Sequence, residues 1–165
     1  MFTIFSIMLL EQEGKLKLDD DIRQYLPELP DYGSKITLRH LANHTSGLRD
    51  NTALANLIGT HEVDMFSNDQ AVNLLLRQQG LNFKTGERHE YCNSGYILLA
   101  EIVKRVSGQT FAEFTHDRIF KPLKMDHSQF IDDPEIVIKN RAYSYHEYLN
   151  VLYKTILNLS FVGST

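Results

Sequence analysis

The chain has 165 residues, a length that suits one domain, and a formal net charge of −4 at pH 7. Hydrophobic residues make up 42% and charged residues 23%, as in ordinary soluble proteins. The negative charge and the lack of a basic block argue against a nucleic-acid partner. The single cysteine excludes an internal disulfide. No apolar run approaches the roughly 18 residues that a membrane span needs.

The first predicted element is a helix over residues 2–13 that is apolar on most faces, and such a helix is normally buried. Its large apolar side chains are Phe2, Ile4, Phe5, Ile7, Met8, Leu9 and Leu10. The segment has no basic n-region and no small-residue cleavage site, so it does not match a signal peptide. The sequence therefore favours a core helix and leaves the compartment open.

Capping residues predict the next elements. Thr37 can N-cap a short helix, which Gly47 would end, and residues 51–68 read as a loop that contains a short helix. Ser67 or Asn68 can cap a helix over residues 69–79.

The clearest helical pattern covers residues 94–106, with apolar side chains at helical spacing and a closing Ser107-Gly108. Thr110 caps a further helix that ends at Pro122. The tail from Arg141 alternates aromatic and polar residues, which indicates strands.

The hexapeptide Tyr91-Cys92-Asn93-Ser94-Gly95-Tyr96 places a phenol and a carboxamide two residues apart, just ahead of the clearest helix. Four other segments accompany it: His44-Thr45-Ser46-Gly47-Leu48, Phe83-Lys84-Thr85-Gly86-Glu87-Arg88, Ile119-Phe120-Lys121-Pro122-Leu123-Lys124-Met125 and Asn140-Arg141-Ala142-Tyr143-Ser144-Tyr145. Together they resemble the serine β-lactamase-related hydrolases, which include class C β-lactamases, D-alanyl-D-alanine peptidases and their esterase relatives. The resemblance covers nearly the whole chain.

The resemblance implies a chain that is mainly α-helical: the helical subdomain, plus edges, of the α/β serine β-lactamase and D,D-peptidase fold. Residues 1–165 would form a partial domain truncated at both ends, because the sheet strands at the ends of the family chain are mostly absent. The implied parent activity is acyl transfer to serine, followed by hydrolysis of a small acyl substrate: a β-lactam, a D-alanyl peptide or an ester. Neither a metal nor an organic cofactor is implied, and relatives are often periplasmic or secreted.

By the same resemblance, Tyr91 matches the catalytic tyrosine that faces the serine and relays its proton, and Asn93 matches the asparagine that helps to hold the acyl substrate. A tyrosine with a reference pKa of about 10 needs a nearby cation to act as a base near neutrality. The family supplies that cation as the lysine of a Ser-x-x-Lys motif. Without their flanking segments, the two residues would read as a buried tyrosine and a helix-capping asparagine.

The Ser-x-x-Lys motif occurs nowhere in the 165 residues. The family places it at the start of the helix that continues into a stretch matching residues 9–16, so its lysine would fall just before Met1. Two classes of function stay open. One is a serine hydrolase whose serine and lysine lie outside this sequence, which makes the chain inactive as given. The other is a non-catalytic remnant, or a subdomain that binds a ligand or partner.

Three other signals have simpler interpretations. Lys84-Thr85-Gly86 spells the family's third motif but precedes Tyr91, so Gly86 reads as a turn residue. His40 and His44 would share a helix face, but a zincin needs glutamate where Leu41 stands, so we predict no metal site. Cys92 could be a thiol nucleophile, but a small, half-buried apolar residue is the preferred interpretation.

Overall fold

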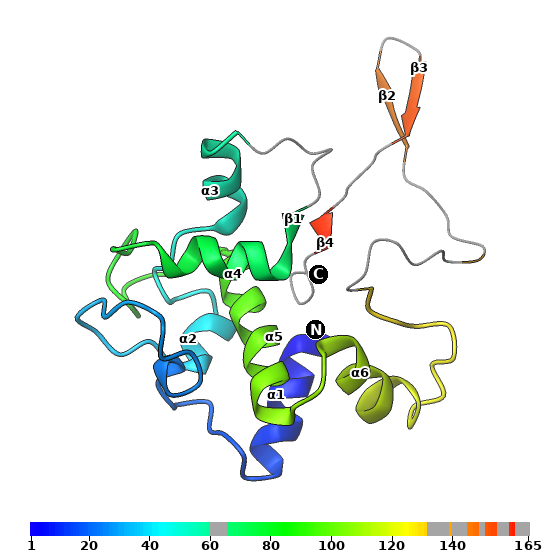
Figure 1. Ribbon diagram of the computed structural model, residues 1–165, viewed down its shortest axis with the longest axis horizontal. Helices are drawn as coiled ribbons and strands as arrows, with labels where there is room; N and C mark the ends of the chain where they lie inside the picture. The colour runs from blue at the N-terminus through cyan, green and yellow to red at the C-terminus, as the bar shows by residue number, and fades with distance from the viewer. Residues whose placement is uncertain (60–65, 132–138, 140–144, 149–150, 155–158, 161–165) are drawn as a thin grey trace.

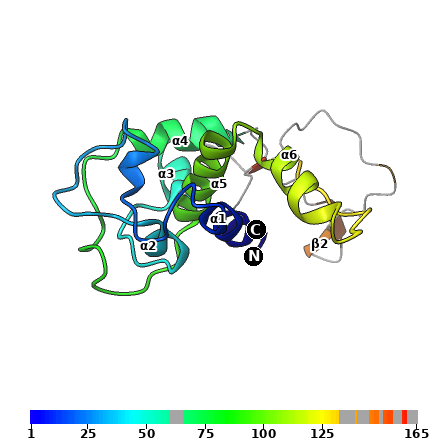
Figure 2. The same ribbon diagram turned by 90° about the horizontal axis from the view of Figure 1, so that it is seen from below.

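The computed structural model describes residues 1–59, 66–131, 139, 145–148, 151–154 and 159–160. Helix α5 (Asn93–Ser107) is central in Figure 1 and contacts every other α-helix of this part of the chain. These helices are α1 (Phe2–Gln12), α2 (Leu38–Ala42), α3 (Asn51–Leu57), α4 (Asn68–Leu76) and α6 (Phe111–Thr115). Figure 2 shows α1 directly beside α5.

Two single-turn elements complete the helical body: the 3-10 helix η1 (Ile22–Gln24) and the π-helical turn η2 (His116–Phe120), which continues α6. In the described ranges, none of the helices has both the length and the apolar character that crossing a bilayer requires.

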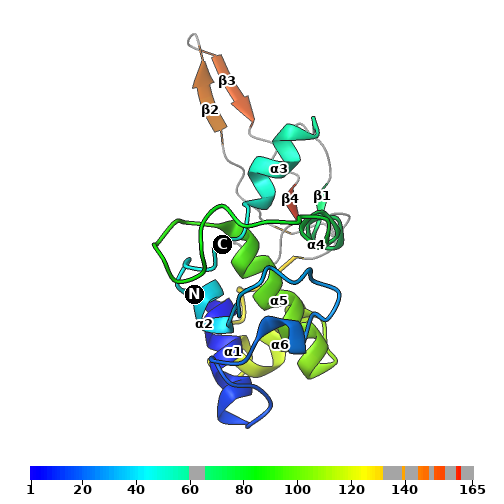
Figure 3. The same cartoon turned by 90° about the vertical axis from the view of Figure 1, so that its left-hand side faces the viewer.

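The described strands form two small pairs. Strand β1 (Phe66–Ser67) pairs in parallel with β4 (Leu159–Ser160), with Phe66 opposite Leu159. Strands β2 (Tyr145–Tyr148) and β3 (Val151–Lys154) form an antiparallel hairpin that stands apart from the helices in Figures 1 and 3. The predicted mainly helical class is confirmed, and the tail contains strands as expected. Residues 140–144 of the last motif lie outside the described residues.

Helix α5 forms because its apolar residues recur at helical spacing and its ends are marked. Ile97, Leu98, Leu99, Ile102 and Val103 are fully buried, so this helix supplies much of the core. Its C-terminal residue is followed by Gly108 at a φ of +74°, the left-handed conformation that glycine adopts most easily. The prediction of a helix over residues 94–106 is therefore confirmed, with one extra residue at each end.

Two predicted helix ends were wrong. Helix α2 ends at Ala42 rather than at Gly47, because His44 already has a left-handed φ of +56°. Gly47 has a different role, since a Cβ there would lie 2.1 Å from the carbonyl oxygen of Phe83. Helix α4 ends at Leu76 instead of residue 79, where the Gln78 side-chain amide donates to the Leu74 carbonyl at 3.1 Å.

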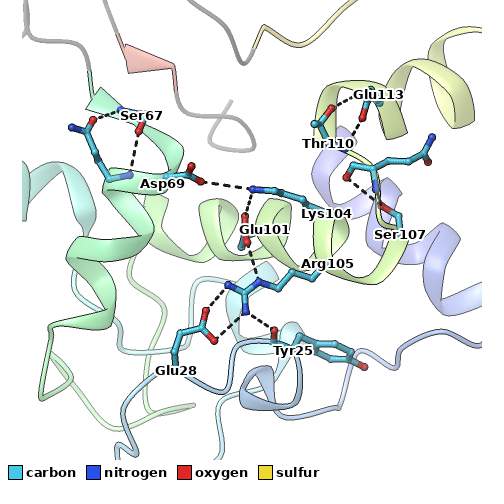
Figure 4. Close-up of polar contacts among 12 residues, drawn as sticks. Tyr25, Glu28, Ser67, Asp69, Glu101, Lys104, Arg105, Ser107, Thr110 and Glu113 are labelled. Atoms are coloured by element: carbon cyan, nitrogen blue, oxygen red, sulfur yellow. Dashed lines mark hydrogen bonds and ion pairs between the residues drawn. The ribbon is translucent and has the colours of Figure 1, made fainter.

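A charged network joins α5 to the irregular segment after η1 (Figure 4). Arg105 donates to Glu101 at 2.9 Å, to the Tyr25 carbonyl at 3.1 Å, and to both carboxylate oxygens of Glu28. Bidentate pairing of this kind fixes geometry as well as adding energy. Because the Glu101 side chain is only 9% exposed, Arg105 and Lys104 also offset the cost of burying its charge.

Helix α1 is buried on one face and exposed on another. Its fully buried residues include Thr3 and Ser6 beside Ile7 and Leu10, and the Ser6 hydroxyl donates to the Phe2 carbonyl at 2.9 Å. On another face three large apolar residues are exposed: Met1 is 81% exposed, Phe5 41% and Met8 53%. The described helices therefore bury one side of α1 and leave the other side uncovered.

We expect the uncovered face of α1 to make the chain self-associate, because contiguous exposed apolar surface is seldom tolerated in a monomer. The double variant Phe5→Lys, Met8→Lys should shift size-exclusion elution toward the monomer. Leu57→Lys is the matched control, since it removes an exposed leucine on α3. A wild-type chain that elutes as a single monomer and melts in one cooperative transition would contradict this expectation.

Candidate functional site

Tyr91 and Asn93 contact each other at the start of α5. The Tyr91 hydroxyl donates a hydrogen bond to Asn93 Oδ1 at 3.0 Å. The tyrosine faces solvent and is 63% exposed. This exposure contradicts the interpretation of Tyr91 as a buried core tyrosine. Among the described residues, this carboxamide is the hydrogen-bond partner of the phenol, and no lysine or arginine hydrogen-bonds to it.

Asp50 holds Asn93 from the other side. Its Oδ2 accepts the backbone N–H of Asn93 at 2.6 Å and the side-chain Nδ2–H at 3.1 Å. Its Oδ1 accepts the N–H groups of Thr52 at 2.9 Å and Ala53 at 3.2 Å, so the same carboxylate is the N-cap of α3. Asn93 is therefore anchored through both its backbone and its side chain.

His44 packs against the tyrosine. Its ring centroid lies 4.7 Å from that of Tyr91 and 5.1 Å from that of Tyr96, nearly parallel to the latter at 16°. Its Nδ1 accepts the backbone N–H of Cys92 at 3.3 Å, and its carbonyl accepts that of Glu90 at 2.9 Å. Burial lowers the pKa of the His44 ring, which favours the neutral form that an accepting Nδ1 requires.

Cys92 and Ser94 have structural roles between these contacts. The Cys92 thiol is buried and donates to the Leu48 carbonyl at 3.4 Å. Burial raises the pKa of this thiol, which makes a thiolate nucleophile unfavourable. The Ser94 hydroxyl donates to the Arg49 carbonyl at 2.6 Å and accepts the Asn51 N–H at 2.8 Å, so it ties α5 to the start of α3.

The remaining sequence signals lie around the same loop. Thr85 donates through its hydroxyl to the Ser46 carbonyl at 3.0 Å, and Gly86 is a turn residue as predicted, with a φ of +81°. His40 belongs to the capping box of α2, where its Nδ1 accepts the Thr37 N–H at 3.2 Å. In the part of the chain that is described, no three His, Cys, Asp or Glu side chains are grouped to hold a metal ion.

The role of Asp50 and the stacking of His44 were not predicted from the sequence. The sequence does indicate Asp50 as the N-cap of a helix that starts at Asn51, since aspartate is a favoured N-cap residue. Nothing in the local pattern shows that the same carboxylate also reaches Asn93, 43 residues later. That contact depends on how α3 and α5 meet in the fold.

Comparisons with known proteins show the family. The beta-lactamase family matches residues 1–158. The chain belongs to the beta-lactamase family. It is 37% identical over 151 residues to "Penicillin-binding protein 4*" of Bacillus subtilis, covering 87% of this chain and 32% of that protein. It is 34% identical over 127 residues to the D-aminopeptidase of Brucella anthropi, covering 76% of this chain and 24% of the relative.

Solved structures of related proteins are similar to this chain along nearly its whole length. A D-stereospecific amidohydrolase from a Streptomyces species superposes with a TM-score of 0.81 at 25% identity, covering 99% of this chain and 52% of that one. The octameric penicillin-binding protein homologue from Pyrococcus abyssi superposes with a TM-score of 0.82 at 27% identity, covering 99% and 38%. The chain thus has the beta-lactamase and penicillin-binding-protein fold, and it spans about a third of one curated relative and about a quarter of the other.

The lowered pKa of His44 predicts how stability changes with pH. Its ordinary value is 6.5, and burial lowers it in the folded state, as it also does for His40. As pH falls, the unfolded chain binds the proton first, so the free energy of unfolding should decrease between about pH 7 and pH 5. Urea unfolding at a series of pH values measures this slope.

His44→Asn should make that slope shallower, because asparagine tolerates the positive φ but does not titrate. His116→Asn, which replaces an exposed histidine on η2, is the control. If wild type and His44→Asn lose stability in parallel as pH falls, His44 is not held in the neutral form by the fold.

Proposed function

We propose that Tyr91 and Asn93 form part of the acyl-transfer site of a serine hydrolase. Tyr91 is the catalytic proton relay, and Asn93 holds the acyl substrate. The observation that carries the proposal is the exposed Tyr91 side chain, whose hydroxyl donates a hydrogen bond to the Asn93 carboxamide. Asp50 in turn anchors that carboxamide. A phenol that only packed in the core would be buried, and a carboxamide that only capped a helix would face its own backbone.

The names of the relatives support a substrate class. They include D-aminopeptidase, D-stereospecific amidohydrolase, D-amino acid amidase and penicillin-binding protein. We propose that the longer protein acts on a small acyl compound of this kind: an amide or peptide of a D-amino acid, a β-lactam or an ester.

The nucleophile is the part that the 165 residues do not contain, since no serine is followed by lysine three residues later. We propose that the serine and lysine come from residues beyond this sequence. The relatives' greater length supports this, because the chain covers 32% of one and 24% of another. In this proposal residues 1–165 are a partial domain.

The isolated chain should therefore form no covalent acyl-enzyme, because the covalent step needs the nucleophile. The test is incubation with a labelled penicillin and with a fluorophosphonate, followed by intact mass measurement. We expect unmodified protein in both cases. A stoichiometric adduct on a serine of this chain would refute the proposal. If a longer form that contains Ser-x-x-Lys also fails to react, the chain is a non-catalytic member of the family.

In a longer form that reacts, Tyr91→Phe should reduce kcat by roughly 10²–10⁴, the usual worth of a general acid–base group, with KM nearly unchanged. Tyr96→Phe is the matched control, because it removes a hydroxyl that donates to the Ala42 carbonyl at 3.3 Å on the other side of His44. Steady-state kinetics on a D-amino acid amide compares the two. Equal activity of Tyr91→Phe and wild type would leave Tyr91 with a packing role only.

A further inference from the structure

We propose that Asp50 is a positioning residue for the Tyr91–Asn93 pair: its carboxylate determines which way the Asn93 carboxamide faces, and so determines the acceptor of the Tyr91 hydroxyl proton. The inference rests on the proposed function, because it concerns the same pair. It is carried by a continuous set of contacts from the start of α3 to the phenol.

The first step is the direction of the carboxamide. The two ends of an asparagine side chain have nearly the same shape, but one donates and the other accepts. An ionised carboxylate only accepts, so the Nδ2 end of Asn93 must face Asp50, where the distance is 3.1 Å. The Oδ1 end then faces the Tyr91 hydroxyl at 3.0 Å. The opposite orientation would place two acceptors against each other.

The second step is the rigidity of Asp50 itself. Its carboxylate accepts two N–H groups from the first turn of α3 and two from Asn93, so both oxygens are engaged. A carboxylate at the start of a helix is also favoured by the helix dipole, and here it lies at the start of both α3 and α5. Asp50 cannot rotate without losing bonds to two elements at once.

The third step concerns the hydrogen-bonding groups of the pair that remain available to a substrate. Beyond the contacts with Asp50 and Tyr91, the Asn93 carboxamide has one more N–H and one more acceptor lone pair. Because the phenol directs its O–H toward Asn93, the lone pairs of its oxygen are free to accept a hydrogen bond from another donor. Asp50 thus sets the polarity of the pair through its contacts with Asn93.

The test replaces Asp50 by serine, which is as good an N-cap as aspartate but has one hydroxyl oxygen in place of a carboxylate that accepts four N–H groups. The matched control is Asp21→Ser, since Asp21 caps η1 by accepting the Arg23 N–H at 2.9 Å and contacts neither Tyr91 nor Asn93. The probe is the 165-residue chain labelled with ¹⁵N and with ¹³Cζ-tyrosine. Tyr91→Phe identifies the Tyr91 signal by its loss.

We expect Asp50→Ser to speed hydrogen exchange of the Asn93 side-chain N–H about tenfold, the size expected from losing one charge-assisted hydrogen bond. The ¹³Cζ resonance of Tyr91 should also move, whereas Asp21→Ser should change neither signal. If Asp50→Ser leaves both signals as in the wild type, Asp50 only caps α3 and the inference is wrong. If circular dichroism shows that Asp50→Ser is unfolded, Asp50→Asn keeps the shape and removes the charge, and the same two signals decide.

These readouts need no nucleophile, so the two proposals can fail separately. Unchanged signals in Asp50→Ser refute the positioning role alone. A fully active Tyr91→Phe enzyme in the longer form refutes the catalytic role of Tyr91, and leaves the contact between Asp50 and Asn93 as it is.

Discussion

The carboxylate of Asp50 is the interaction on which this region depends. Every helix begins with backbone N–H groups that have no partner within the helix. The N-cap residue of α5, Cys92, provides no side-chain hydrogen bond for them. Asp50 accepts the first of these N–H groups from 43 residues earlier in the chain, while it caps α3. One side chain therefore fixes where two helices begin relative to each other.

Backbone hydrogen bonds extend this junction into a paired loop. The segment after α2 and the segment that leads into α5 are joined at three points, where Asn82, Gly86 and Glu90 donate to Gly47, Thr45 and His44 respectively, at 2.7, 2.8 and 2.9 Å. The close approach at the first point explains the glycine, since any side chain at Gly47 would collide with the Phe83 carbonyl. Two of the motifs, residues 44–48 and 83–88, thus form one structural unit with the segment that leads into α5.

The sequence predicted those helices whose apolar spacing and capping residues lie within the helix or next to it. The helix over residues 94–106 was predictable because apolar spacing and a terminal glycine agree, and Thr37, Ser67 and Thr110 each cap the helix that follows them. The end of α2 was not predictable, because it depends on a left-handed histidine held by contacts to residues 90–92. Which face of α1 is buried could not be predicted either, since its apolar residues surround the helix and give no preferred side.

The same distinction applies to the site. Tyr91 and Asn93 could be singled out from their spacing and their flanking segments, whereas Asp50 could be recognised only as a helix cap. Its second role arises from the tertiary meeting of α3 and α5, which no short window contains. In the described part of the chain, the contacts that hold the pair come from residues 44–94. The orientation of the phenol and the carboxamide is therefore built by the helical part of the fold itself, and in the function that we propose the serine and lysine would meet a pair that is already arranged. Preorganisation of this kind reduces the cost of assembling the catalytic geometry when the reaction occurs.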